Sequence, residues 1–115
     1  MNFNRKEDRL SIQLISSIRE VNENRRSFCI VRNISRRGVY ITAKITLLLG
    51  QAVECIISFG EERIILTGVV RRVQEEQIGG WGYGIEITDI TEDYERVLED
   101  FIEAGYLPGM EGKEI

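Results

Sequence analysis

The feature of this chain that most constrains its fold is a series of short segments with large apolar side chains at every second position. Glycine stands at every second position of residues 80–84, and the intervening and following positions carry Trp81, Tyr83, Ile85 and Ile87. Period-2 geometry puts the glycines on one face of a strand and the large side chains on the other. Glycines at this spacing allow sharp coiling or the close approach of another backbone, as at a barrel corner. We therefore predict a strand over about 81–88; a phosphate-binding GxGxxG loop has a different spacing.

Other segments have the composition of strands and are separated by turn signals. The first holds Leu10, Ile12 and Leu14 and then a shifted apolar pair, Ile15 and Ile18, which suggests a bulge before the turn at 22–24. A second, β-branched strand covers 28–32, and 33–38 has the composition of a turn. Further strands are expected at 39–42, 51–59 and 62–73. Gly60 and Glu61 suit a two-residue hairpin loop between the last two.

Only the end of the chain has helical periodicity. Asp89-Ile90-Thr91-Glu92 resembles a capping box, and apolar side chains then recur at helical spacing at Tyr94, Val97, Leu98, Phe101 and Ile102. We expect this stripe to pack on the sheet, with a partner-binding helix as the alternative. The expected fold is all-β with one helix, a six-stranded antiparallel β-barrel closed by a C-terminal α-helix over 10–104. Residues 105–115 are expected to form a disordered tail.

Composition limits the classes of function. The 115 residues, 43% of them hydrophobic, suit one domain with one core. The chain has no His, which excludes His-based metal sites and imidazole bases, and Cys29 and Cys55 are expected to be two buried core thiols. With no visible nucleophile–base pair, carboxylate dyad or metal cluster, we expect a protein that is not an enzyme and has no metal or cofactor. No secretory signal or membrane-length apolar run is visible, so we expect a cytoplasmic protein without membrane insertion.

Charge is distributed unevenly along the chain. Residues 1–37 hold nine basic and four acidic side chains, whereas 38–115 hold six basic and fifteen acidic ones. A basic end on an acidic protein favours a compact anionic ligand over a nucleic-acid polymer, which the acidic remainder would repel. A solvated basic face with no partner is the alternative.

Two short motifs stand out. The first is an RxxxR pattern from Arg5 to Arg9, and the second is Asn33-Ile34-Ser35-Arg36-Arg37-Gly38, an [DN]xSxxG pattern. About one RxxxR is expected by chance at this arginine content, so the first pattern alone carries little weight. The second is rarer, with roughly 0.04 occurrences expected from the residue frequencies.

Their context strengthens both motifs. An RxxxR before a first strand, followed two strands later by [DN]xSxxG at a β-turn, resembles the layout of the PilZ domain family. The segments Thr67-Gly68-Val69-Val70-Arg71 and Gly82-Tyr83-Gly84-Ile85-Glu86-Ile87 also resemble later strands of that family, so the resemblance runs from Arg5 to about Phe101. It implies a split barrel that acts as a bacterial receptor for cyclic di-GMP. It also implies a protein partner, unidentified here, in a motility, secretion or polysaccharide-synthesis machinery.

The resemblance also implies site residues. Arg5 and Arg9 would clamp guanine and phosphate, Asn33 and Ser35 would offer polar groups from the opposing turn, and Gly38 would allow close backbone approach. The planar fork of Arg matches both a phosphate and the O6/N7 edge of guanine, which Lys does not reproduce. The alternative is that Asn33 and Ser35 only shape a turn and Gly38 supplies a positive φ. Further candidates for ligand contact are Lys6, Arg36, Arg37 and Trp81.

Residues 1–9 suggest a mechanism of signalling. Their only large apolar side chains are Met1 and Phe3, too few to order the segment alone. We expect a flexible ligand-binding arm that folds over the dinucleotide and thereby creates a new surface for the partner. Two alternatives stay open: a PilZ-fold adaptor that binds no dinucleotide, and a small-barrel binder of single-stranded nucleic acid.

Overall fold

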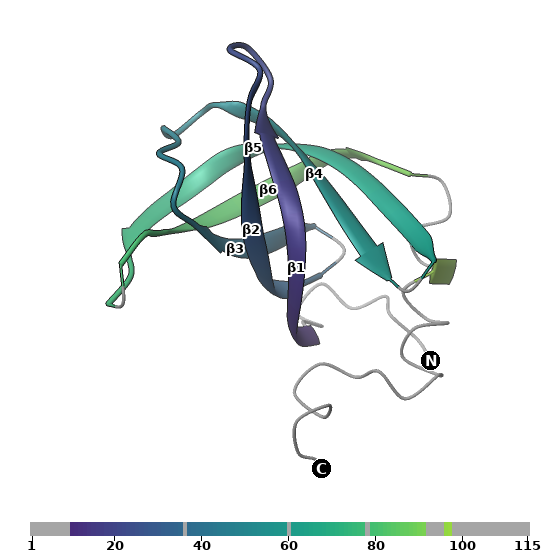
Figure 1. Cartoon of the computed structure of the whole chain (residues 1–115). Helices are drawn as coiled ribbons and strands as arrows, with labels where there is room; N and C mark the ends of the chain where they lie inside the picture. The colour runs from purple at the N-terminus through teal and green to yellow at the C-terminus, as the bar shows by residue number, and fades with distance from the viewer. Residues whose placement is uncertain (1–9, 36, 60, 78, 92–95, 98–115) are drawn as a thin grey trace.

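The computed structural model describes residues 10–35, 37–59, 61–77, 79–91 and 96–97. These residues form six strands: β1 (Leu10–Glu20), β2 (Arg25–Ile34), β3 (Gly38–Ala43), β4 (Ala52–Phe59), β5 (Glu62–Glu75) and β6 (Trp81–Ile90). The strands close into an antiparallel barrel in the order β1-β2-β3-β6-β5-β4, with β1 pairing with β4 (Figure 1). The six-stranded antiparallel barrel predicted from the sequence is confirmed.

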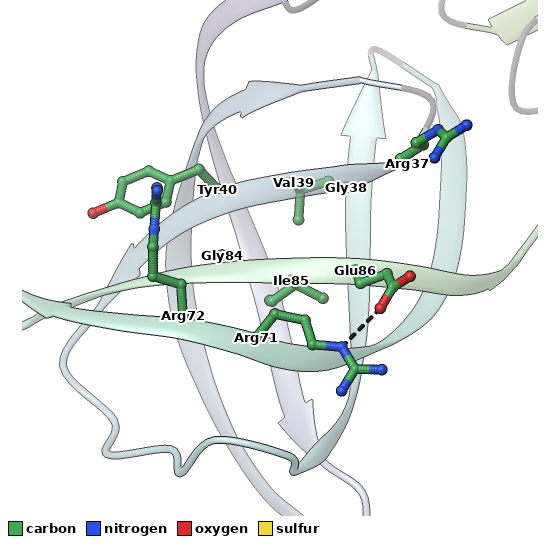
Figure 2. Close-up of a pocket in the computed structure, with 9 residues that line it drawn as sticks. All are labelled: Arg37, Gly38, Val39, Tyr40, Arg71, Arg72, Gly84, Ile85 and Glu86. Atoms are coloured by element: carbon green, nitrogen blue, oxygen red, sulfur yellow. Dashed lines mark hydrogen bonds and ion pairs between the residues drawn. The ribbon is translucent and has the colours of Figure 1, made fainter. Parts of the chain in front are cut away.

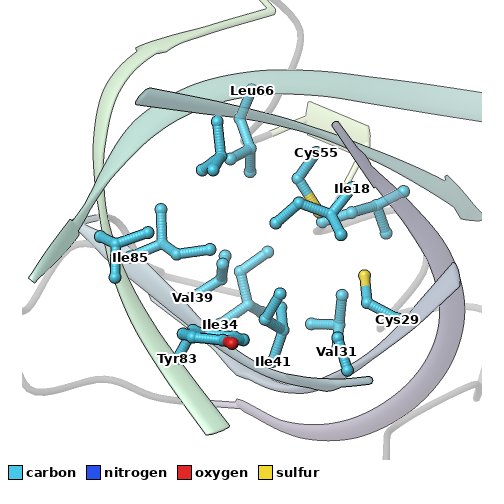
Figure 3. Packing of buried hydrophobic residues seen from close by; sticks show 14 of the residues in the cluster. Ile18, Cys29, Val31, Ile34, Val39, Ile41, Cys55, Leu66, Tyr83 and Ile85 are labelled. Atoms are coloured by element: carbon cyan, nitrogen blue, oxygen red, sulfur yellow. The ribbon is translucent and has the colours of Figure 1, made fainter. Parts of the chain in front are cut away.

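The core fills the inside of this barrel with the alternate side chains of every strand (Figure 3). In β6, Tyr83 and Ile85 are buried, as the period-2 pattern predicted. The Tyr83 hydroxyl donates to the carbonyl of Ile45 at 2.7 Å and accepts from the backbone N–H of Leu47 at 2.9 Å. These bonds tie the β3–β4 connection to the core, and burial raises the pKa of Tyr83.

Cys29 and Cys55 are free, buried core thiols, as expected. Their contact inside the barrel raises the pKa of the Cys55 thiol, through a hydrogen bond with Cys29 first and burial second. A thiol held protonated in this way acts as a small apolar group, because the thiolate is the nucleophile and metal ligand.

The first hairpin ends where the sequence predicted, because β1 runs to Glu20, just before the predicted turn at 22–24. The second strand of the hairpin starts earlier than predicted, at Arg25 rather than Phe28. A register shift is present in β1 between Ser11 and Leu14. The buried Glu20 carboxylate accepts hydrogen bonds from the N–H groups of Asn22 and Glu23 and from the Gln51 side chain. A buried carboxylate with several donors stabilises the tight turn that follows.

The end of β6 corrects the capping-box prediction. Asp89 and Ile90 belong to the strand, and Ile90 pairs with Leu66. The Thr91 N–H donates to the Ile65 carbonyl at 3.1 Å, while its hydroxyl accepts from the Ile65 N–H at 2.8 Å. Asp89 cannot cap a helix, because the β5–β6 pairing extends past it.

The expected C-terminal helix stays a prediction, because only Arg96 and Val97 of it are described. Val97 is buried in the core cluster. The predicted arm at 1–9 and tail at 105–115 lie outside the described residues. No helix in the described part of the chain has the length and apolar character needed to cross a membrane.

Candidate functional site

The loop between β2 and β3 is held by the Ser35 side chain. The Ser35 hydroxyl lies 3.3 Å from the N–H groups of Arg37 and Gly38 and accepts from both. The Ser35 N–H donates to the Gly38 carbonyl at 2.9 Å. With 1% of its surface exposed, Ser35 shapes the loop from beneath.

Gly38 is required by a close approach of two strands. A Cβ atom at this position would lie 2.6 Å from the carbonyl oxygen of Ile85 on β6. Its φ is not positive, unlike those of Gly50, Gly79 and Gly80, so the positive-φ explanation for this glycine is wrong. The Ile87 N–H also donates to the Arg37 carbonyl at 2.8 Å, which fastens the loop to β6.

Asn33 lies in a strand, where the sequence predicted a turn. It pairs with Tyr40 across β2 and β3, just after a register shift between Val31 and Asn33. The ladder continues to the pair Ile34 and Val39, because both of these side chains are buried in the core. The turn therefore covers only the residues between Ile34 and Gly38.

An open pocket of about 280 Å³ begins where this loop ends (Figure 2). It lies on the outer surface of β3, β6 and β5, and it is lined by Arg37, Gly38, Val39, Tyr40, Arg71, Arg72, Gly84, Ile85 and Glu86. These side chains include three guanidinium groups and one carboxylate, so the pocket carries a net positive charge. A site of this kind attracts a compact anion.

One wall of the pocket is a stacked pair. The Arg72 guanidinium lies over the Tyr40 ring, 5.4 Å from its centroid (Figure 2). A Cβ at Gly84 would lie 3.3 Å from the Arg72 Cβ, so the glycine leaves room for this arrangement. Burial and the hydrogen bond that the Tyr40 hydroxyl donates to Glu76 raise the pKa of Tyr40 to about 12. The wall therefore presents a planar cation and a neutral phenol over a wide pH range.

The opposite wall holds an exposed ion pair. Arg71 Nε lies 2.7 Å from Glu86 Oε1, and both side chains are more than half exposed. Exposed pairs of this kind are worth about 0–1 kcal/mol, so an incoming anion can compete for Arg71 at little cost.

A bulge explains how two consecutive arginines reach the same pocket. Neighbouring residues of a regular strand point to opposite faces, so Arg71 and Arg72 could not both face outward. The register shifts between Val70 and Arg72, and both arginines are exposed. Sequence reasoning missed these two residues and Tyr40; the signal was a charged pair inside an otherwise alternating strand.

The structure brings together part of the predicted site. Arg37 and Gly38 line the pocket, and Ser35 lies buried in the loop behind them. Trp81 stands at the start of β6, is partly buried against the core and does not line this pocket. The predicted contacts outside the described residues are Arg5, Lys6, Arg9 and Arg36.

Comparison with known proteins identifies the family. The model of the PilZ domain family matches residues 3–104, and the chain belongs to this family. PilZ domains form a cyclic di-GMP-binding family of receptors and adaptors. A search of curated proteins gave no match.

Two solved structures share the fold. The Bacillus subtilis inhibitor of motility, MotI/DgrA, has a TM-score of 0.70 and 21% identity, covering 89% of this chain and 51% of that one. The chain therefore spans about half the length of that protein. The PilZ domain of YcgR from Escherichia coli, solved with c-di-GMP, has a TM-score of 0.57 and 10% identity, covering 88% of each chain.

Proposed function

We propose that this protein is a bacterial, cytoplasmic and non-catalytic receptor for cyclic di-GMP. The observation that carries the proposal is the position of the Asn33–Gly38 motif, whose loop runs directly into the pocket of Arg37, Arg71 and Arg72. Cyclic di-GMP has two phosphate charges and two guanines. Guanidinium groups bind phosphate and the guanine edge in the same bidentate way and also stack on planar rings.

The described pocket supports different contacts at its two ends. Near the loop, Arg37 and Arg71 offer charge to a phosphate, and the exposed ion pair leaves Arg71 available for exchange. At the other end, the Arg72–Tyr40 stack offers a flat surface to a guanine. Asn33 would read the ligand from the neighbouring strand, while Ser35 would hold the loop in its binding shape.

Arg5 and Arg9 would complete the site from the N-terminal arm, with Lys6, Arg36 and Trp81 as further candidate contacts. In this proposal the arm orders over the dinucleotide, and the new surface signals to a protein partner in a motility, secretion or polysaccharide-synthesis machinery. The likeness of fold to an inhibitor of motility supports an output through protein contact.

Titration calorimetry with cyclic di-GMP tests the proposal. We expect binding by the wild type and a loss of about tenfold or more in affinity in Arg5→Ala and in Arg9→Ala. Arg63→Ala is the matched control, because Arg63 is an exposed arginine near the other end of β5. A generic single-stranded oligonucleotide in place of the dinucleotide tests the nucleic-acid alternative.

No heat with the wild type at micromolar protein would favour the adaptor and overturn the receptor proposal. The arm is tested separately by NMR relaxation of the backbone. We expect the order of residues 2–9 to rise when the dinucleotide is added. An arm with the same order in both states would contradict the proposed signal.

A further inference from the structure

A second outward surface of the barrel, on β1 and β2, is apolar where a barrel in water is usually polar. Phe28 is 80% exposed and Ile15 is 74% exposed. Ile15 pairs directly with Ile30, and Phe28 pairs with Ser17 one step further along the same face. These three apolar side chains are therefore neighbours and form one patch, which we call the β1–β2 face. Contiguous exposed apolar groups of this kind mark interaction surfaces.

A groove adjoins the β1–β2 face. It has a volume of about 240 Å³ and runs between β2 and the β5–β6 connection. Phe28 and Ile30 form its apolar side, and Lys44 and Glu76 lie on the other side. The β1–β2 face thus has a projecting aromatic side chain, Phe28, and a groove next to it. This combination suits the side chains of a docked segment.

Three cations border this face: Arg26, Arg32 and Lys44. Arg26 donates to the Ser17 hydroxyl at 2.9 Å, and Arg32 donates to the Thr42 hydroxyl at 3.2 Å. Among the described residues, neither these two arginines nor Lys44 forms an ion pair with a carboxylate. Elsewhere on the described barrel some arginines, such as Arg19 and Arg71, are paired with a glutamate, and others, such as Arg63 and Arg72, are not. The apolar face is therefore bordered by three cations that form no ion pair with a carboxylate of the described residues.

We propose that the β1–β2 face is a docking site for an acidic amphipathic segment of a partner protein. Apolar side chains of that segment would cover Ile15 and Phe28 and enter the groove, while its carboxylates would pair with Arg26, Arg32 and Lys44. Charge complementarity selects this occupant over a basic segment, which the three cations would repel. The proposal names the surface for the protein partner of the proposed receptor, and it rests on that function only for its biological role.

The two sites meet at one hydrogen bond. Tyr40 lines the arginine pocket, Glu76 lines the groove, and the Tyr40 hydroxyl donates to the Glu76 carboxylate. A ligand that moves Tyr40 would also change the position of a carboxylate that opposes docking of an acidic segment. The pocket and the docking groove are therefore in contact through Tyr40 and Glu76.

Selection from a displayed library of random peptides of about 16 residues, against the full chain without dinucleotide, tests the proposal. We expect the selected peptides to combine apolar residues with an excess of Asp and Glu over the unselected library. Fluorescence anisotropy of the best peptide should show a loss of about tenfold or more in affinity in Phe28→Ser and in Arg26→Glu. Ile65→Ser and Arg63→Glu, on the outer side of β5, should bind as the wild type does.

Recovery of no peptide, of peptides without acidic enrichment, or of peptides that bind all four variants equally would overturn the proposal. Light scattering provides a separate check: if the chain self-associates and Phe28→Ser makes it monomeric, the face belongs to a second copy and the proposal is wrong. Unfolding midpoints close to that of the wild type show that the variants are folded. Calorimetry with cyclic di-GMP on the same variants keeps the two proposals apart, since Phe28→Ser should retain dinucleotide binding.

Discussion

The arginine pocket on β3, β6 and β5 is charged and hollow, whereas the β1–β2 face is apolar and raised. In the pocket, Gly38 and Gly84 keep the surface low, so the long side chains of Arg71 and Arg72 lie across it. On the β1–β2 face, Phe28 and Ile15 project into solvent. Both surfaces cover the same core. The comparison shows that the side chains at the outward positions of a closed barrel can be charged on one side and apolar on another, because the fold depends on the inward positions.

The first prediction disturbs the close packing of β3 against β6 beneath the pocket and has the largest expected effect on stability. Gly38→Ala places a Cβ 2.6 Å from the Ile85 carbonyl oxygen, so β3 and β6 must separate. We expect the free energy of unfolding to fall by about 1–3 kcal/mol, measured by urea denaturation. Gly84→Ala, whose nearest contact is the Arg72 Cβ at 3.3 Å, is the milder control. Equal stability of Gly38→Ala and the wild type would contradict the role assigned to this glycine.

The second prediction separates the two surfaces by ligand. Arg72→Ala removes a guanidinium and its stack on Tyr40, and we expect the affinity for cyclic di-GMP to fall about 10- to 100-fold by calorimetry. Arg26→Ala removes the same charge from the β1–β2 face and should leave the affinity unchanged. If both variants lose affinity equally, net charge attracts the ligand and the pocket does not.

The third prediction tests how the net charge of the pocket affects its affinity for the dinucleotide. Glu86→Gln releases Arg71 from its ion pair and removes the one carboxylate among the described residues that line the pocket. We expect stability to change by less than about 1 kcal/mol and affinity for the dinucleotide to rise about two- to fivefold. Glu62→Gln, which breaks the exposed pair with Arg96 outside the pocket, is the control. A fall in affinity in Glu86→Gln would show that Glu86 contacts the ligand favourably.

The fourth prediction concerns pH at the border of the two surfaces. The pKa of Tyr40 is raised from 10.0 to about 12, by burial first and by the Glu76 hydrogen bond second. The folded state thus favours the neutral phenol, so its contribution to stability is complete below pH 10 and is lost as the pH rises toward 12. Absorbance titration of the wild type against Tyr40→Phe should resolve this group. Glu76→Gln should lower the pKa of Tyr40 in part, because the charge of Glu76 is removed while burial, the larger cause, remains; an unchanged value would contradict the contribution assigned to Glu76.

Much of the fold was predictable because alternation in a strand is a local property. The glycine and aromatic pattern of β6 predicted which side of that strand is buried. A bulge was expected in β1 and one is present, but it lies before Leu14 and not at the shifted pair, since pairing is regular from Leu14 onward and Ile15 is exposed. Strand ends were predicted less well. Asn33 and Asp89 are of residue types that favour turns and helix caps, but the pairing with a neighbouring strand continues past both of them.

The candidate site was predictable only in part. The motif around Ser35 and Gly38 was visible in the sequence, and the structure places Gly38 at the edge of the pocket. Arg71, Arg72 and Tyr40 could not be assigned to it from the sequence, because they come from strands whose register joins them only in the closed barrel.

By itself, the sequence determined the class of fold and the inward side of its strands, because apolar side chains at every second position leave one face to bury. Only the tertiary structure decided which outward side chains meet. Contacts between β3, β6 and β5 depend on strand order, register and the bulge at Arg71, and these arise only when distant segments pair to close the barrel.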